Sequence, residues 1–178
     1  MNMLSVREMK LEDASRIVDY FVDADRDFLI GMGADPDKLP SKESWLALLE
    51  NELNKPLKEK EFYYIIWQIN GQAVGHCNIN KIEFGDKATM HLHLWDKESR
   101  KSGNGYEFMK MTLPYFFTNF QLKTVVCEPY AENPAPNRML HKLGFEYKGP
   151  ITKTPGWINF HQTVNHYELS HKNFSQAD

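Results

Sequence analysis

The 178-residue sequence contains only two cysteines, Cys77 and Cys127, and both lie in apolar stretches. Two buried thiols give no disulfide framework, and their surroundings do not have the spacing of a zinc site, so we expect reduced cysteines and no metal. The sequence also lacks an apolar run of 18 residues, and residues 1–10 lack the hydrophobic core of a signal peptide. These absences favour a cytoplasmic protein that does not interact with membranes.

An excess of basic residues is also missing, since the formal net charge is −3. Proteins that bind nucleic acids normally carry a basic patch, so we expect no nucleic-acid partner. No internal repeat or low-complexity segment interrupts the chain. The length predicts one domain over residues 1–178, of which 175–178 are expected to form a frayed tail.

The most informative stretch is R-K-S-G-N-G at residues 100–105. It follows an extended run, Ala88–Trp95, and precedes a helix that we expect to begin near Tyr106. Free N–H groups at a helix start bind phosphate well, and glycines let the backbone approach such a ligand closely. The predicted phosphate-binding residues are Arg100, Lys101, Ser102, Gly103, Asn104, Gly105 and Tyr106.

Two well-known phosphate loops do not fit this stretch. A P-loop requires Lys and Ser or Thr after its second glycine, but Gly105 is followed by Tyr106 and Glu107. A dinucleotide fingerprint requires a third glycine where Phe108 stands. The remaining pattern, R-x-x-G-x-G, resembles the acetyl-CoA pyrophosphate loop of the GNAT superfamily of N-acetyltransferases. A glycine-containing helix cap without a ligand is the alternative interpretation.

A second stretch, Asn133–Phe145, resembles another sequence block of the same superfamily. The resemblance is closest to the branch of the ribosomal-protein N-terminal acetyltransferases, whose block runs roughly N-x-A-S-N-R-x-L-x-K-L-G-F. Gly144 is expected to end a helix in the left-handed conformation. The amides of Asn133 and Asn137 are predicted to contact the pantetheine arm of the cosubstrate.

The resemblance implies an α/β GNAT fold. Its sheet would be mixed and mostly antiparallel, with six to seven strands splayed between strands 4 and 5 and about four flanking helices. Hydrophobic periodicity independently predicts the order β-α-α-β-β-β-α-β-α-β-β. We expect Pro114 to kink or end the helix that follows the phosphate loop.

The resemblance also implies the reaction. A primary amine of a small molecule or a peptide N-terminus would attack the thioester of acetyl-CoA directly, without an acyl-enzyme. A backbone N–H near the end of strand 4 would stabilise the oxyanion, which places Leu94 and Trp95 beside the pantetheine and the thioester. The main alternative from another class is a non-catalytic module that binds or senses acyl-CoA.

Candidate acid and base residues are few. His91 and His93 lie two apart on strand 4, so both project from one face, and histidine suits proton removal near neutrality. Two satisfied imidazoles on a polar face are an equally good interpretation. The relatives' tyrosine and serine positions hold Leu140 and Pro136, neither of which can donate a proton. The thiolate could leave unprotonated, leave through water, or take a proton from Tyr130, which is the candidate acid.

The resemblance also implies an acceptor side built from the first two helices, from their connection at residues 23–40 and from the loop before the last strand. The connection is rich in aspartate, which would attract a cationic amine, although a solvated acidic loop is the simpler explanation. The loop carries Trp157 and Phe160. We expect these two rings to cover the core, and the alternative interpretations are a wall of the acceptor pocket and a dimer contact. A homodimer is possible.

Overall fold

The structure, a computed structural model, describes residues 2–101 and 103–175. One seven-stranded sheet organises it, with the strand order β1-β2-β3-β4-β5-β7-β6. The strands are β1 (Leu4–Glu8), β2 (Phe62–Ile69), β3 (Gln72–Glu83), β4 (Lys87–Leu94), β5 (Thr124–Cys127), β6 (Glu146–Lys153) and β7 (Gln162–Ser170). All neighbouring strands are antiparallel except β4 and β5. The predicted mixed α/β sheet is confirmed.

Four longer helices stand in the predicted order: α1 (Ala14–Val22), α3 (Lys42–Asn54), α5 (Asn104–Phe120) and α6 (Pro134–Lys142). The prediction of about four helices omitted three short ones: α2 (Arg26–Gly31), α4 (Lys97–Lys101) and α7 (His171–Ser175). Their five or six residues are too few for a recognisable helical period. Single 3₁₀ turns lie at η1 (Leu11–Asp13), η2 (Pro36–Lys38) and η3 (Leu57–Glu59). Within the described ranges, no helix is both long and apolar enough to cross a membrane.

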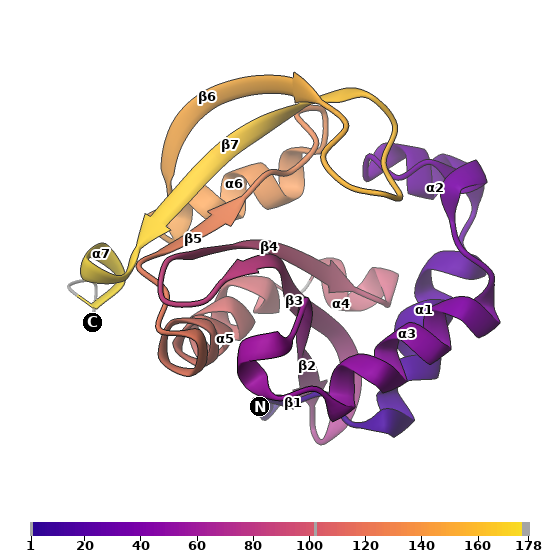
Figure 1. Cartoon of the computed structure of the whole chain (residues 1–178). Helices are drawn as coiled ribbons and strands as arrows, with labels where there is room; N and C mark the ends of the chain where they lie inside the picture. The colour runs from indigo at the N-terminus through magenta and orange to yellow at the C-terminus, as the bar shows by residue number, and fades with distance from the viewer. Residues whose placement is uncertain (1, 102, 176–178) are drawn as a thin grey trace.

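The sheet opens between β4 and β5, as predicted. The parallel ladder joins only Lys87–Met90 to Thr124–Cys127. Beyond Met90, β4 continues to Leu94 beside β3 alone, and β5 has already ended at Cys127. In Figure 1 the strands β5, β7 and β6 separate from β4 toward the end that carries α2 and α4.

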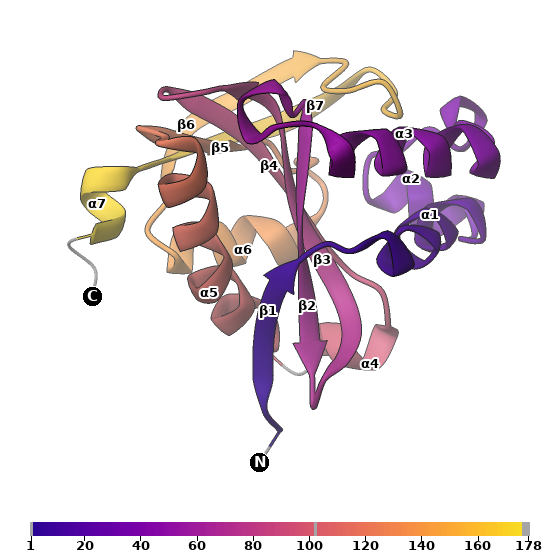
Figure 2. The same ribbon diagram turned by 60° about the horizontal axis from the view of Figure 1, so that its bottom comes forward.

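Helices cover the two faces of the sheet unequally. Figure 2 shows α5 and α6 on one side of the central strands and α1 and α3 on the other. The face under α5 is anchored by Trp67 of β2, whose indole stacks on Phe108 with ring centroids 5.0 Å apart and donates to Thr112 Oγ1 at 2.8 Å. On β4, Met90 packs into this core, so by strand alternation His91 and His93 project toward α1.

Several local predictions can be checked directly. Asn70 and Gly71 form the β2–β3 turn with φ values of 50° and 79°, and Gly144 has a φ of 84°, as predicted. Ser41 accepts a hydrogen bond from Ser44 N and caps α3. Pro114 was expected to kink or end its helix; it does not end it, because α5 continues to Phe120, and a kink stays a prediction. The buried apolar residues Leu113, Phe116, Phe117 and Phe120 hold the final turns against the sheet.

A β-bulge sets the register between β3 and β4. Lys81 adopts a φ of 48°, and the pairing shifts between Asn80 and Glu83. This shift brings His76 directly opposite His93 and Asn78 opposite His91. The bulge therefore collects three imidazoles on the face that α1 covers.

Candidate active site

The end of β4 supplies the backbone donor that an acyl transfer requires. Trp95 N donates to Val74 O at 2.9 Å, across the ladder to β3. Backbone groups of a strand alternate between its two edges, so the N–H groups of Leu92 and Leu94 point to the opposite edge, where β5 has ended. The N–H of Leu94 is therefore available to an oxyanion, whereas that of Trp95 is used by Val74 O. The placement of both residues beside the pantetheine and the thioester stays a prediction.

Arg100 has a different position from the one expected. Its Nε donates to Leu94 O at 2.8 Å and its Nη2 to Trp95 O at 3.0 Å. The guanidinium carbon also lies 4.3 Å from the ring centroid of Phe28. Arg100 is therefore not free beside the phosphate loop. It fixes the end of β4 and links that end to α2.

The predicted phosphate loop leads directly into α5. Gly103 has a φ of 74°, a conformation that glycine adopts without strain, and the helix begins at Asn104. A Cβ added at Gly103 would meet no atom within 4 Å, whereas one at Gly105 would lie 3.3 Å from Met139 Sδ of α6. Open space at a turn followed by a 17-residue helix fits a bound phosphate.

The other residues of the predicted phosphate loop are Lys101, Ser102 and Tyr106, and the structure describes two of them. Lys101 ends α4, and Ser102 lies outside the described residues. Tyr106 lies in the first turn of α5, where the ammonium groups of Lys142 and Lys110 lie 4.3 and 5.9 Å from its ring centroid. The two lysines place positive charge close to this helix start.

The two asparagines of the second block differ. Asn133 is the N-cap residue of α6 and makes no side-chain capping bond. Asn137 is fully engaged, because its Nδ2 donates to Tyr130 O and Asn133 O while its Oδ1 accepts from Asn165 and Tyr167. The contact of Asn137 with pantetheine stays a prediction, and in this structure the amide is engaged within the chain. Its amide holds α6 against β7.

His91 and His93 are half-buried, and the pKa of each is lowered, which favours the neutral imidazole. Burial lowers the pKa of His91 to about 4, and the charge of Lys81 acts in the same direction. Burial also lowers the pKa of His93 well below its usual value, and His76 contributes to this effect. The Nε2 atom of His91 lies 3.1 Å from Asn80 Oδ1, an acceptor, so Nδ1 is the nitrogen that can take a proton.

His76 is a residue that the sequence did not single out. It is 1% exposed, and burial lowers its pKa to about 3. Trp95 Nε1 donates to its Nδ1 at 2.9 Å, and its ring centroid lies 5.1 Å from that of His93. This contact fixes the orientation of Trp95 on the acceptor face.

Tyr130 follows β5 on the far side of the opening. Its ring lies edge-on to Phe160 with centroids 5.7 Å apart, and it forms an isolated β-bridge with Val164. Burial and a hydrogen bond to Glu132 raise the pKa of its hydroxyl. These contacts make Tyr130 a weak proton donor. Leu140 is fully buried in the core.

A cavity of about 500 Å³ lies at the end of β4, between α1 and α2. We call it the acceptor pocket. Its lining comprises Arg16, Asp19, Tyr20, Asp23, Ala24, Asp25, Phe28, Trp95 and Arg100. Tyr20 connects it with the histidines, because its ring centroid lies 5.4 Å from that of His93. The pocket thus combines three carboxylates with two arginines, Arg16 lying over the ring of Trp95 at 4.9 Å and Arg100 over that of Phe28 at 4.3 Å.

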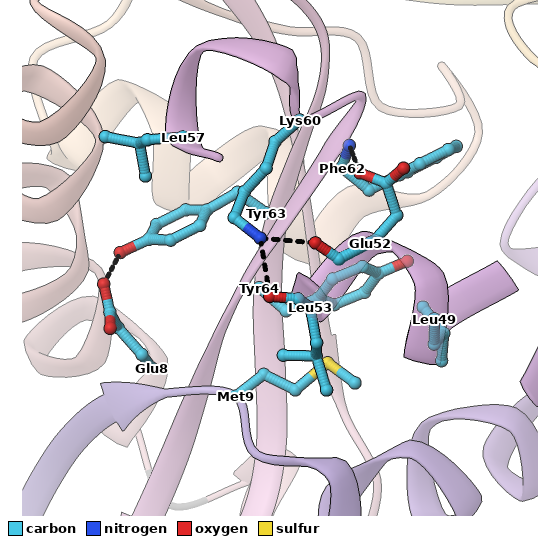
Figure 3. Close-up of a pocket in the computed structure, with 10 residues that line it drawn as sticks. All are labelled: Glu8, Met9, Leu49, Glu52, Leu53, Leu57, Lys60, Phe62, Tyr63 and Tyr64. Atoms are coloured by element: carbon cyan, nitrogen blue, oxygen red, sulfur yellow. Dashed lines mark hydrogen bonds between the residues drawn. The ribbon is translucent and has the colours of Figure 1, made fainter. Parts of the chain in front are cut away.

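A second cavity, of about 250 Å³, lies between α3 and the first residues of β2 (Figure 3). Its polar groups satisfy one another. Lys60 Nζ donates to the carbonyl oxygens of Glu52 and Leu53, the side chain of Glu52 accepts from Phe62 N, and Tyr63 donates to Glu8. These contacts close the end of α3 and leave little chemistry for a ligand. Among the described residues, no three His, Cys, Asp or Glu side chains are grouped to hold a metal ion.

Comparisons with known proteins agree with this geometry. The family model of the acetyltransferase (GNAT) domain matches residues 4–146, so the chain belongs to the GNAT acetyltransferase family. Among proteins with curated annotation, none matches by sequence. The spermidine N-acetyltransferase of Vibrio cholerae, solved with CoA and spermine, superimposes with a TM-score of 0.79 at 15% identity, covering 97% of this chain and 98% of that chain.

Two further solved structures have the same fold. A dodecameric form of the Vibrio cholerae spermidine N-acetyltransferase has a TM-score of 0.75 at 13% identity and covers 98% of both chains. An uncharacterized protein from Bacillus halodurans has a TM-score of 0.72 at 17% identity, covering 98% of this chain and 88% of that chain. The protein is an N-acetyltransferase that transfers the acetyl group of acetyl-CoA to an amine.

Proposed function

We propose that the acceptor is a small linear amine with more than one positive charge, and that it binds in the acceptor pocket. The observation that carries this proposal is the lining of that pocket. Asp19, Asp23 and Asp25 supply three negative charges, one more than the two positive charges of Arg16 and Arg100 in the same lining, and this surplus favours a cationic ligand. The likeness in fold to a spermidine N-acetyltransferase solved with spermine gives independent support.

In this proposal the end of β4 organises the chemistry. Acetyl-CoA supplies the thioester, with its phosphates at the start of α5. The neutral amine nitrogen attacks the carbonyl carbon and the C–N bond forms. The C–S bond then breaks, and CoA leaves as the thiolate with the electron pair of that bond. Leu94 N–H stabilises the oxyanion, and the amine proton passes to Nδ1 of His91, to His93 or to water. Both imidazoles are neutral, so they place no positive charge beside the cationic acceptor.

Thiol release from acetyl-CoA tests the proposal over a panel of diamines, polyamines, amino acids, aminoglycosides and peptides. We expect the highest kcat/KM with a linear polyamine. Asp25→Asn removes an exposed carboxylate of the pocket, so KM for that amine should rise about fivefold, as for one exposed charge pair. Asp27→Asn is the matched control, because Asp27 lies in the same helix but outside the pocket lining. Binding of acetyl-CoA without turnover of any amine would favour the non-catalytic alternative.

A peptide N-terminus is the second candidate acceptor. The block Asn133–Phe145 favours it, because it resembles the ribosomal-protein branch. The same panel separates the two acceptors. The homodimer, the cytoplasmic location and the single domain over residues 1–178 stay predictions.

A further inference from the structure

We infer that Arg16 and Arg100 hold positive charge beside the end of β4 and thereby keep the attacking nitrogen of the acceptor unprotonated. The aspartates of the acceptor pocket bind the other, charged nitrogen of the same molecule. The inference rests on the proposed function, because it concerns the same amine in the same pocket. It explains why a pocket for a cation also contains two arginines.

The chemistry of the amine makes such positive charge useful. An alkylamine in solution has a pKa near that of a lysine side chain, about 10.4, so at pH 7 only about one molecule in 2,500 is neutral. The lone pair of the nitrogen forms the C–N bond, and an ammonium group has no lone pair. The acceptor must therefore lose one proton to water before the attack, and its next proton leaves once the C–N bond has formed. Positive charge nearby favours the first of these losses.

Arg100 supplies one positive charge and is firmly held. Its Nε and Nη2 donate to the carbonyl oxygens of Leu94 and Trp95, at 2.8 and 3.0 Å. Its charge also acts on a group of the pocket lining. Burial raises the pKa of Tyr20 to about 12, and the charge of Arg100 opposes this rise. A phenol and an ammonium group respond in the same direction, since positive charge favours loss of the proton from either.

Arg16 supplies the second positive charge from α1. Its guanidinium carbon lies 4.9 Å from the ring centroid of Trp95, and that ring is fixed because its Nε1 donates to His76 Nδ1 at 2.9 Å. Among the residues that the structure describes, Arg16 forms no ion pair, and Asp19 of the same helix pairs with Lys42 instead. Without an ion-pair partner in this part of the chain, the charge of Arg16 acts on whatever occupies the pocket.

Two aspartates lie toward the other end of the pocket. Asp23 follows Arg16 by seven residues and is the C-cap of α1, so it lies about 10 Å further along the helix axis. Asp25 is the N-cap residue of α2. The pocket is therefore positive beside β4 and negative where α1 ends and α2 begins. A linear amine with two nitrogens places its charged nitrogen at the negative end and its attacking nitrogen at the positive end.

The other titratable groups around the pocket keep their charge between pH 7 and pH 10. Burial lowers the pKa values of three histidines, which are neutral over this range: His76, His91 and His93. The hydrogen bond to Asp19 raises the pKa of Lys42, and Tyr20 stays protonated because its pKa is about 12. The carboxylates of η1, α1 and the start of α2 ordinarily titrate far below this range; they are Glu12, Asp13, Asp19, Asp23 and Asp25. A pH profile over this range therefore reports the protonation of the amine itself.

Removing the charge of Arg16 tests the inference, because this side chain is exposed and holds no backbone group of β4. In the Arg16→Gln variant we expect kcat for spermidine at pH 7 to fall about fivefold, since a larger share of the bound amine keeps its proton. KM should fall by a similar factor, because the ammonium form then binds better without reacting, so kcat/KM stays within about twofold. At pH 10 the difference in kcat should be less than about twofold, because most of the bound amine is neutral in either protein.

Two further variants separate charge from packing. Arg16→Lys keeps a positive charge over Trp95, so its kcat and KM should stay within about twofold of those of the unaltered protein at both pH values. Arg26→Gln removes an exposed arginine of α2 that pairs with Asp37 and lies outside the pocket lining, and it should change neither constant.

The outcomes separate the inference from the proposed function. A fall in kcat by the same factor at pH 7 and pH 10, or an equal fall in Arg16→Lys, would show that Arg16 only packs against Trp95 and would overturn the inference. Unchanged kcat in Arg16→Gln would overturn it as well. Turnover of no amine, with acetyl-CoA bound, would refute the proposed function itself. Selection of a peptide by the acceptor panel would refute only the polyamine, and the same pH profile measured with that peptide would then decide the role of Arg16.

Discussion

Lowering the pH from 7 to 5 should destabilise the fold through the histidines of β3 and β4. Burial lowers the pKa of His76 to about 3 and that of His91 to about 4. In the unfolded chain each would titrate near pH 6.5. The unfolded state therefore binds more protons between these values, so stability is full above pH 6.5 and is lost as the pH falls toward 4.

The loss of stability at pH 5 depends little on how low the histidine pKa values are in the folded protein. At pH 5 both imidazoles are still neutral in the folded protein, whereas this pH lies about 1.5 units below their pKa in the unfolded chain. Each imidazole therefore lowers the free energy of unfolding by about 2 kcal/mol. His76 and His91 together remove about 4 kcal/mol, and His93 acts in the same direction. A domain of this size is typically stable by about 5–15 kcal/mol, so the protein should be close to unfolding.

Urea unfolding at pH 7, 6 and 5 measures this loss. His76→Gln keeps an acceptor for Trp95 Nε1 but cannot take up a proton. The decrease in its free energy of unfolding between pH 7 and pH 5 should therefore be about 2 kcal/mol smaller than that of the unaltered protein. His161→Gln, at an exposed position, is the control and should leave the loss unchanged. The same pH dependence in the unaltered protein and His76→Gln would show that His76 is not held neutral by burial.

Three further predictions concern cosubstrate binding and the chemical step. Gly103→Ala adds a methyl group to the open space where we expect the phosphate, so calorimetry should show a CoA Kd raised about fivefold, whereas Gly85→Ala, at a left-handed glycine in a remote turn, should leave the Kd unchanged. Arg100→Lys should lower kcat about tenfold with the CoA Kd intact, because it releases Leu94 O and Trp95 O; a weakened Kd would instead place Arg100 on the diphosphate. His91→Ala should lower kcat/KM by the same factor at pH 6 and pH 8, since its pKa is about 4, and a factor that changes between these values would contradict the assignment.

Local sequence signals predicted the framework well. The run Phe62–Ile69, the turn at Asn70 and Gly71, and the strand Thr124–Cys127 lie where the sequence placed them. Each is determined by residues that are neighbours in the chain, such as a left-handed turn or a continuous apolar strand. Pro114 is the exception, because tertiary packing of α5 overrides its local preference.

Residues of the site were predicted less well, because their roles depend on partners far away in the sequence. Arg100 and Asn137 have the right chemistry for a ligand, but Leu94 O and Tyr167 respectively engage them in the fold. His76 was missed for a geometric reason. A regular hairpin from the Glu83–Lys87 pair would have placed it opposite Leu94, and only the bulge at Lys81 moves it opposite His93.

Because the ladder between β4 and β5 is short, ligand binding at the end of β4 can be followed by amide hydrogen exchange. The amide hydrogens of Leu92 and Leu94 point to an edge without a neighbouring strand, whereas Cys77 lies on β3 between two paired strands. Isotope exchange at the two leucines therefore needs only small fluctuations, while exchange at the inner strand needs the sheet to open. A thioester held at that edge would slow exchange there first, and binding could be read residue by residue without any label on the ligand.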